Sequence, residues 1–207
     1  MKLILSPPNQ LTVLRILLTP VFLVLLFSGE SALRQWSLLV YIVAALTDWY
    51  DGWLARRWGY VTRWGAFLDP FADKVLTSAA LIAFVILHII PAWPVWIIVG
   101  RDVIVTGLRS YAEFRGRPFD TSRLAKTKTF TQLVVIYYIL ILYVARESFL
   151  QQKYASIIDS LLHPTLVYAL IVAVAAITLL SGILYIVGNR GTIRDLADAE
   201  RPELKDV

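Results

Sequence analysis

The sequence contains no cysteine, only two histidines and few charged residues for a chain of 207 residues. The missing cysteine excludes disulfides, thiolate nucleophiles and thiolate-bound metals. Charged residues make up 17% of the chain and hydrophobic residues 58%. A soluble domain of this length carries more charge and less apolar material, so the composition indicates an integral membrane protein.

The sequence contains a series of long apolar runs. Six of them are long enough for a hydrocarbon core of about 30 Å. They lie at residues 11–28, 36–55, 66–90, 93–114, 129–145 and 164–188. We therefore predict an all-α, polytopic integral membrane protein with six transmembrane helices. A membrane domain at residues 1–188 would begin with a short interfacial segment at 1–10 and be followed by a polar cytoplasmic tail at 189–207.

Lysine and arginine are distributed unevenly between the predicted loops. With a cytoplasmic N-terminus, the cytoplasmic side receives residues 1–10, the 56–64 and 115–128 segments and the tail, which hold most of the cations. The opposite side receives only Arg34, Arg146 and Lys153. This imbalance is the orientation signal expected of cytoplasmic loops.

One polar pattern interrupts the second and third apolar runs, with the spacing D-x2-D-G-x2-A-R-x8-G-x3-D-x3-D. Its members are Asp48, Asp51, Gly52, Ala55, Arg56, Gly65, Asp69 and Asp73. Residues three or four apart share a helix face, so each aspartate pair should project from one side of its helix. A short turn between the helices would bring both pairs to one depth near the cytoplasmic surface. Carboxylates gathered there either take up protons or bind cations.

The chemistry of this pattern favours a metal-assisted phosphoryl transfer. Oxygen ligands without histidine or cysteine favour magnesium, manganese or calcium. Four carboxylates suffice for two ions, and two ions stabilise the attacking and leaving oxygens of a phosphoryl displacement. Arg56 adds a cation suited to phosphate, and the small residues Gly52, Ala55 and Gly65 allow a diphosphate or a flat ring to approach the backbone.

Three other interpretations of these residues are possible. The small residues could serve helix packing alone. The aspartates could belong to a buried salt-bridge network with Lys74, Arg101 and Arg109. They could also form the cation pathway of a transporter, but a transporter predicts interrupted helices and duplicated halves, which the sequence does not display.

A second set of polar residues follows the pattern. Arg101 and Arg109 are costly inside a membrane span, and Lys126 and Lys128 stand at the cytoplasmic start of the next one. Together they could form a basic pocket for a phosphorylated alcohol. The alternatives are the cytoplasmic charge bias for the two lysines and ion pairs with Asp102 or Glu113 for the two arginines.

The complete eight-residue pattern resembles the signature of the CDP-alcohol phosphotransferase family, membrane enzymes that move a phosphatidyl or similar group from a cytidine diphosphate donor to an alcohol. The resemblance implies that two divalent cations, Mg²⁺ or Mn²⁺, are held by Asp48, Asp51 and Asp69, with Asp73 completing the site and serving as general base. It assigns contacts with the cytidine diphosphate to Asp48, Gly52, Ala55, Arg56, Gly65 and Asp69.

Further stretches, at residues 8–15, 65–75, 101–109 and 126–132, resemble the bacterial members of this family that use glycerol 3-phosphate. The implied reaction joins CDP-diacylglycerol and glycerol 3-phosphate to give phosphatidylglycerophosphate and CMP, with inositol phosphate and serine as competing acceptors. The resemblance also implies a homodimer in membrane lipid. The predicted topology places the active site at the cytoplasmic side, and a short chain without a transit segment suits a bacterial inner membrane. No nucleic-acid partner is expected. The resemblance ends near residue 135, so the last two spans carry no functional prediction.

Overall fold

The structure is a computed structural model that describes residues 7–58, 63–116, 119, 123–148 and 150–199. Within its helices the side chains of residues 7–11, 48–58, 63–70, 73, 123–126, 150–152 and 195–199 also lie outside the described set.

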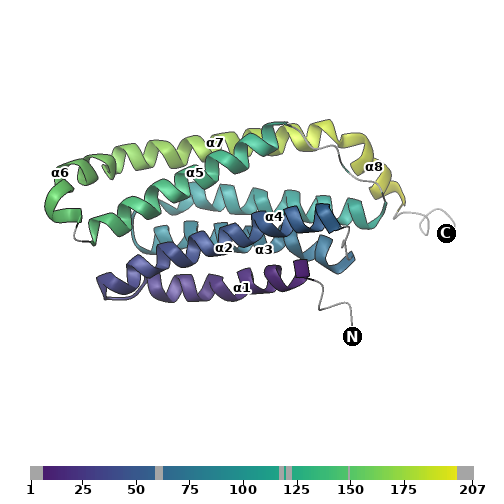
Figure 1. Cartoon of the computed structure of the whole chain (residues 1–207). Coiled ribbons are helices and arrows are strands. Elements are labelled where there is room, and N and C mark those ends of the chain that lie inside the picture. The colour runs from purple at the N-terminus through teal and green to yellow at the C-terminus, as the bar shows by residue number, and fades with distance from the viewer. Residues whose placement is uncertain (1–6, 59–62, 117–118, 120–122, 149, 200–207) are drawn as a thin grey trace.

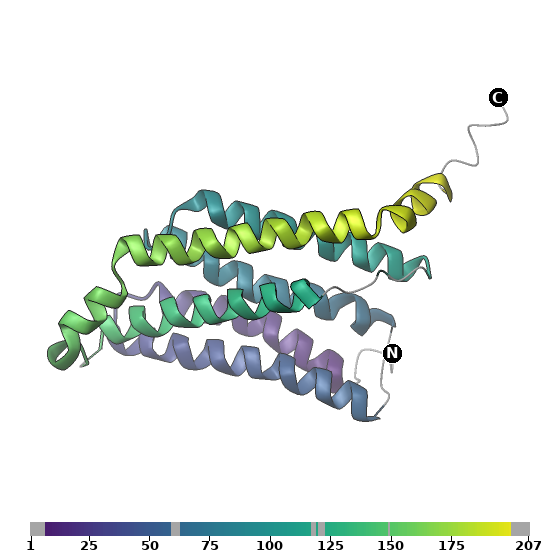
Figure 2. The same cartoon turned by 90° about the horizontal axis from the view of Figure 1, so that it is seen from above.

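The described chain is helical throughout, with short connections (Figure 1). Its helices are α1 (Pro7–Leu26), α2 (Ser31–Trp58), α3 (Arg63–Ile86), α4 (Ala92–Phe114), α5 (Arg123–Arg146), α6 (Leu150–Leu161), α7 (Pro164–Gly188) and α8 (Arg190–Ala199). The long helices lie side by side in one bundle. Both views of the ribbon place the two termini of the described chain, the start of α1 and the end of α8, at the same end (Figures 1 and 2).

The prediction of an all-α chain is confirmed, and each of the six apolar runs corresponds to one long helix. Two helices were not predicted: α6, which precedes the last long helix, and α8, which occupies the first part of the expected polar tail. Neither has the apolar length by which the six long helices were found. At the N-terminus α1 already begins at Pro7, so residues 7–10 form its first turn and only residues 1–6 of the expected interfacial segment precede it. Proline suits a first turn, where its missing N–H has no helical partner.

Apolar side chains cover the outside of the bundle as well as its interior. Among the described residues, Thr127–Arg146 in α5 and Pro164–Gly188 in α7 are long and apolar enough to cross a membrane. Helix α7 is apolar on all sides, since Ile171 and Val174 are buried whereas Leu180 and Ile183 are more than half exposed. A helix that is apolar all round belongs in a protein core or in lipid, and exposed faces of this kind fit lipid.

A shared core connects the long helices. Phe22, Tyr41, Phe84, Ile136 and Ile171 come from five different helices, and each is completely buried. The rings of Phe22 and Tyr41 lie 5.1 Å apart between centroids, a favourable aromatic separation. Because lipid tails are as apolar as these side chains, close packing between helices, rather than removal of apolar surface from water, holds such a bundle together.

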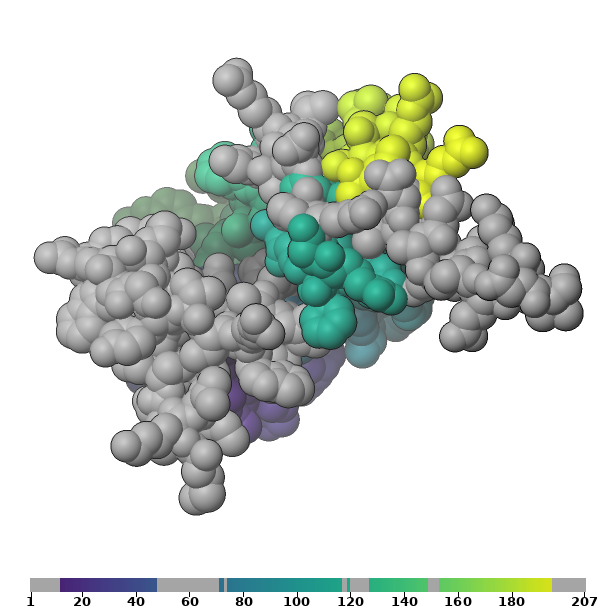
Figure 3. Space-filling view, turned by 90° about the vertical axis from the view of Figure 1, so that its right-hand side faces the viewer, coloured from purple at the N-terminus to yellow at the C-terminus, as the bar shows by residue number. Residues whose placement is uncertain are grey.

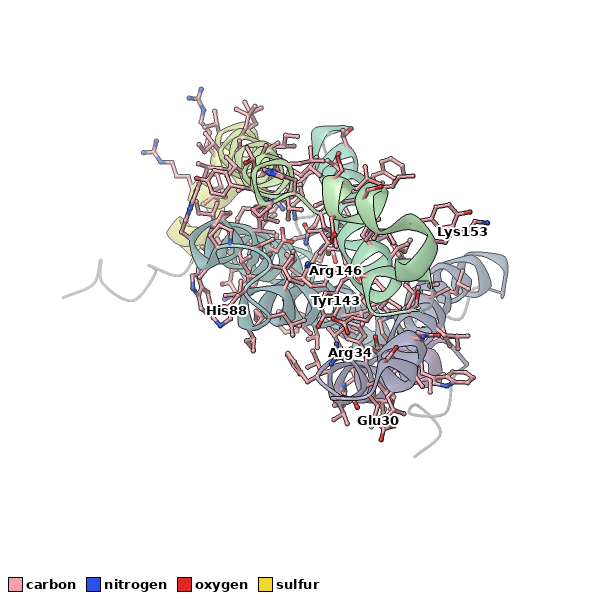
Figure 4. The ribbon with its side chains drawn as sticks, turned by 90° about the vertical axis from the view of Figure 1, so that its left-hand side faces the viewer. Glu30, Arg34, His88, Tyr143, Arg146 and Lys153 are labelled. Carbon is pink, nitrogen blue, oxygen red and sulfur yellow. The ribbon has the colours of Figure 1, made fainter. Side chains whose placement is uncertain are left out.

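The two ends of the bundle carry different segments. The alternating helix directions gather the starts of α1, α3 and α5 and the ends of α2, α4 and α7 at the end that also holds both termini (Figure 1). The opposite end carries Arg34, Arg146 and Lys153 (Figure 4). These are the three cations that the sequence assigns to the other side of the membrane, and they lie together at one end of the bundle (Figure 4).

Candidate functional site

The aspartate pattern lies in the last part of α2 and the first part of α3, at the end of the bundle that carries the termini (Figure 1). Asp48, Asp51, Gly52, Ala55 and Arg56 belong to α2, and Gly65, Asp69 and Asp73 belong to α3. The side chains of these eight residues lie outside the described set. Their assignment as metal and nucleotide ligands therefore stays a prediction.

Next to this pattern, a buried carboxylate gathers cations from three helices. Asp102 on α4 is 2% exposed. It accepts hydrogen bonds from Lys128 Nζ on α5 at 2.5 and 2.6 Å, and from Arg101 Nη1 at 3.2 Å. Lys74 Nζ on α3 lies 4.0 Å from the same carboxylate. We call Lys74, Arg101, Asp102 and Lys128 the basic cluster.

The position of Lys74 connects this cluster to the aspartate pattern. Lys74 directly follows Asp73 in α3, and its ammonium group reaches across to α4. The basic cluster therefore lies beside the helix that carries the second aspartate pair.

Among the described side chains, the cations of the basic cluster outnumber its single carboxylate. Arg101 and Lys128 share one carboxylate, and both side chains are largely withdrawn from solvent, at 13% and 1% exposure. Burying charges is costly unless each is paired and hydrogen-bonded. Within the part of the chain that the structure describes, Arg101 Nε has no hydrogen-bond partner. Such an arrangement is suited to receiving an additional anion.

The sequence grouped Arg101 and Lys128 with Arg109 and Lys126, and the structure brings the first two together. Arg109 lies eight residues further along α4, about 12 Å along the helix axis. Its Nε donates to Glu113 Oε1 at 2.9 Å, and both side chains are more than 40% exposed. Lys126 belongs to the first turn of α5, and its side chain lies outside the described residues. The pairs with Asp102 and Glu113 that the sequence offered as an alternative are thus present.

The end of α4 reaches the surface of the bundle. Figure 3 looks onto the end with the termini, where the teal end of α4 lies near the yellow residues of α7 and α8. Phe119 and Tyr185 meet there edge to face, with centroids 5.7 Å apart, and Ile193 of α8 packs against the same group. Helix α8 thus covers one side of the region that holds Arg109.

Arg15 lies within α1, in the first of the six apolar runs. It is 1% exposed, and its Nε donates to the backbone oxygen of Ala44 on α2 at 3.4 Å. Ala44 lies one helical turn before Asp48. Arg15 therefore ties α1 to the part of α2 that leads into the aspartate pattern.

Two contacts of the basic cluster, both on α7, were not predicted from the sequence. Arg101 Nη2 donates to Ser181 Oγ at 3.1 Å, and the stem of Arg101 lies against Gly182. The available signal was a serine and a glycine inside an otherwise apolar run, since small and polar residues mark helix contacts in membranes.

Comparison with known proteins identifies the family. The family described as CDP-alcohol phosphatidyltransferase matches residues 5–188. The chain belongs to this family. It is 38% identical over 141 residues to a CDP-diacylglycerol--glycerol-3-phosphate 3-phosphatidyltransferase of Bacillus subtilis, covering 62% of this chain and 73% of the relative. Relatives with the same name occur in Salmonella paratyphi A, at 38% identity over 64% of this chain and 75% of the relative, and in Rickettsia typhi, at 35% over 62% and 72%.

Membership of the CDP-alcohol phosphatidyltransferase family makes this chain a membrane-embedded enzyme and implies catalysis that depends on divalent metal ions. Among the described side chains, no three of His, Cys, Asp or Glu converge on a common point. The four motif aspartates, which are outside that set, supply the carboxylate oxygens that Mg²⁺ and Mn²⁺ prefer. The donor chemistry of α2 and α3 thus fits the metal that the family requires.

Proposed function

We propose that this enzyme transfers the phosphatidyl group of CDP-diacylglycerol to glycerol 3-phosphate, forming phosphatidylglycerophosphate and releasing CMP in phospholipid biosynthesis. The names of the relatives from Bacillus, Salmonella and Rickettsia support this acceptor and this donor. The family match over almost the entire chain supports the reaction type.

The basic cluster is the structural feature that favours a phosphorylated acceptor over serine. Arg101 and Lys128 share one buried carboxylate beside the helix of Asp69 and Asp73. A phosphorylated alcohol brings the anion that such a cluster can bind, whereas serine brings no phosphate. We assign the phosphate of the acceptor to Arg101 and Lys128, with Arg109 and Lys126 on the path from the cytoplasm.

The donor is assigned to the aspartate pattern. Its cytidine diphosphate would contact Asp48, Gly52, Ala55, Arg56, Gly65 and Asp69. Two divalent cations, Mg²⁺ or Mn²⁺, would be held by Asp48, Asp51, Asp69 and Asp73. When bound, these ions would supply stabilisation of negative charge on the diphosphate. Arg56 contributes a fixed positive charge to the same task.

The chain's own residues would organise the displacement. The basic cluster orients glycerol 3-phosphate through its phosphate, which leaves the attacking hydroxyl directed towards α3. Asp73 accepts the proton of that hydroxyl as its oxygen bonds to the phosphorus carrying diacylglycerol. The bond between this phosphorus and the oxygen bridging to CMP breaks, and CMP leaves with the electron pair.

The membrane arrangement follows from the same assignment. We infer six transmembrane helices, α1 to α5 and α7, with the end that carries both termini in the cytoplasm. The excess of lysine and arginine in the segments of that end supports this orientation. CDP-diacylglycerol would then enter from the inner leaflet of a bacterial inner membrane, and we expect a homodimer.

An acceptor panel tests the proposal. Detergent-solubilised protein receives CDP-diacylglycerol, magnesium or manganese, and one of glycerol 3-phosphate, inositol phosphate, inositol or serine. CMP release is expected with glycerol 3-phosphate and should stop when EDTA removes the divalent ions. Release only with another acceptor would overturn the assignment of the acceptor, and release that survives EDTA would overturn the metal dependence.

A further inference from the structure

Helix α7 holds the side chain of Arg101 at two adjacent residues. Ser181 Oγ accepts a hydrogen bond from Arg101 Nη2, and Gly182 lies beneath the arginine stem. Ser181 is 2% exposed, and the side chain of Arg101 is 13% exposed. Helix α7 carries none of the residues of the aspartate pattern. It also carries none of the four basic residues assigned to the acceptor, Arg101, Arg109, Lys126 and Lys128.

The hydroxyl of Ser181 is directed towards Arg101 by its own helix. Ser181 Oγ donates its only hydrogen to the backbone oxygen of Thr178 at 2.9 Å. Its lone pairs are then left for the guanidinium, so the hydroxyl acts as an acceptor at this point. The bond back to the helix fixes the serine rotamer and thereby the place of Nη2.

Gly182 provides the space in which the arginine lies. A Cβ atom added at Gly182 would stand 2.9 Å from Arg101 Cγ and 3.1 Å from Nε. Carbon atoms in contact prefer a separation of about 3.5–4.0 Å. The closest atom is near the root of the side chain, so relief would require rotation of the entire arginine and not a small shift of its tip.

Together with Asp102, these contacts fix the guanidinium while leaving donors unused. Nη1 bonds to Asp102 and Nη2 to Ser181, whereas Nε has no partner among the described residues. A guanidinium carries five N–H donors in a rigid plane, which matches the oxygens of a phosphate. A side chain held in advance in its binding geometry loses less freedom when the anion arrives.

We propose that Ser181 and Gly182 are positioning residues that hold Arg101 for the phosphate of the acceptor. This inference rests on the proposed role of Arg101 in binding that phosphate. It means that α7 contributes to the affinity of the enzyme for glycerol 3-phosphate.

Steady-state kinetics with varied glycerol 3-phosphate and CDP-diacylglycerol test the inference. Gly182→Ala should raise KM for glycerol 3-phosphate about tenfold, the effect of losing one hydrogen bond to a charged group, and leave KM for CDP-diacylglycerol unchanged. Gly188→Ala is the matched control, because it lies on the same helix and an added Cβ there has no neighbour within 4 Å. Both substitutions favour helix formation, so a weakened helix would not explain a difference between them.

Combining Gly182→Ala with Arg101→Ala shows whether the rise in KM for glycerol 3-phosphate depends on Arg101. In the Arg101→Ala background the Cγ atom that meets the new methyl group is gone, so adding Gly182→Ala should change KM for glycerol 3-phosphate no further. An equal increase with and without Arg101 would overturn the positioning role. So would a normal KM in Gly182→Ala when Arg101→Ala alone raises it, and that result would leave the proposed function intact.

Two further outcomes of these experiments can be told apart from those above. If Arg101→Ala itself leaves KM for glycerol 3-phosphate unchanged, the acceptor assignment of Arg101 fails and this inference fails with it. If Gly182→Ala cannot be purified as a folded protein, Ser181→Ala decides, because it removes only the hydroxyl. A raised KM for glycerol 3-phosphate in Ser181→Ala would support the inference, and an unchanged KM would overturn it.

Discussion

The two ends of the bundle use ion pairs in different ways. At the end opposite the termini, Arg34 pairs with Glu147 at 2.8 Å and Arg146 with Asp159 at 3.2 Å, one cation to one carboxylate (Figure 4). Three of these four side chains are more than a third exposed. In the basic cluster, by contrast, Arg101 and Lys128 share Asp102 out of solvent.

Under the proposed function, this difference separates charges that only stabilise the fold from charges that also bind a substrate. An exposed one-to-one pair contributes up to about 1 kcal/mol to stability, and many contribute nothing measurable. A buried and unequal set of charges has a high desolvation cost, so its presence needs another reason. Under the proposed function that reason is the phosphate of the acceptor, whose negative charge would complete the pairing when it binds.

The largest expected effect of a single substitution is on turnover. Asp73→Asn removes the proposed base and should lower the rate of CMP release by about 10² to 10⁴-fold. Asp159→Asn, which breaks an ion pair at the other end, should leave that rate unchanged. Substantial activity in Asp73→Asn would exclude Asp73 as an essential base.

The next effect is on stability. Asp102→Asn leaves Lys128 and Arg101 buried without their carboxylate and should lower the free energy of unfolding by about 3–5 kcal/mol. Thermal unfolding in detergent measures the change. Combining Asp102→Asn with Lys128→Met should recover much of the stability but not the affinity for glycerol 3-phosphate. If Asp102→Asn were as stable as the unchanged protein, the Asp102 carboxylate would not be needed to compensate the buried charges of Lys128 and Arg101.

A smaller effect is expected for the second arginine of α4. Arg109 is half exposed and paired with Glu113, so water screens its charge more than that of Arg101. Arg109→Ala should therefore raise KM for glycerol 3-phosphate only about threefold, as for loss of an exposed charge contact, and by less than Arg101→Ala. An equal or larger rise would place the acceptor phosphate nearer Arg109 and away from Asp102.

The smallest effect is expected at the opposite end. Glu147→Gln should lower the free energy of unfolding by about 1 kcal/mol or less, and the difference from the unchanged protein should shrink as salt is raised. Unfolding at low and high ionic strength measures it. A loss as large as that of Asp102→Asn would remove the contrast between the two ends.

Much of the fold was predictable because apolar length is a local property of the sequence. Each of the six long helices corresponds to one of the predicted apolar runs, although α1 ends at Leu26 and α3 at Ile86, before the ends of the runs at 28 and 90. The three cations assigned to the far side do lie at the end opposite the termini (Figure 4). Helices α6 and α8 escaped prediction because a short or polar helix has no such run. The start of α1 at Pro7 was missed because the first apolar run begins only at residue 11, whereas the prolines before it lie in the first turn of the helix.

The candidate site was predictable only in part. The spacing of the aspartates identified the family, which the comparisons confirm. The partners of the basic residues were open, since the sequence allowed both a pocket and ion pairs for Arg101 and Arg109. The structure contains both ion pairs. It also leaves Arg101 Nε without a hydrogen-bond partner among the described residues.

The sequence by itself determined the helical membrane architecture, the family and the reaction type, because helix length and motif spacing act along one chain. Only the tertiary structure decided which cations share a carboxylate, and that Ser181 and Gly182 lie against Arg101, 80 residues away from Ser181. The physical reason is that these contacts depend on how α3, α4, α5 and α7 pack. Packing is set by the shapes of all the facing side chains together and not by any local pattern.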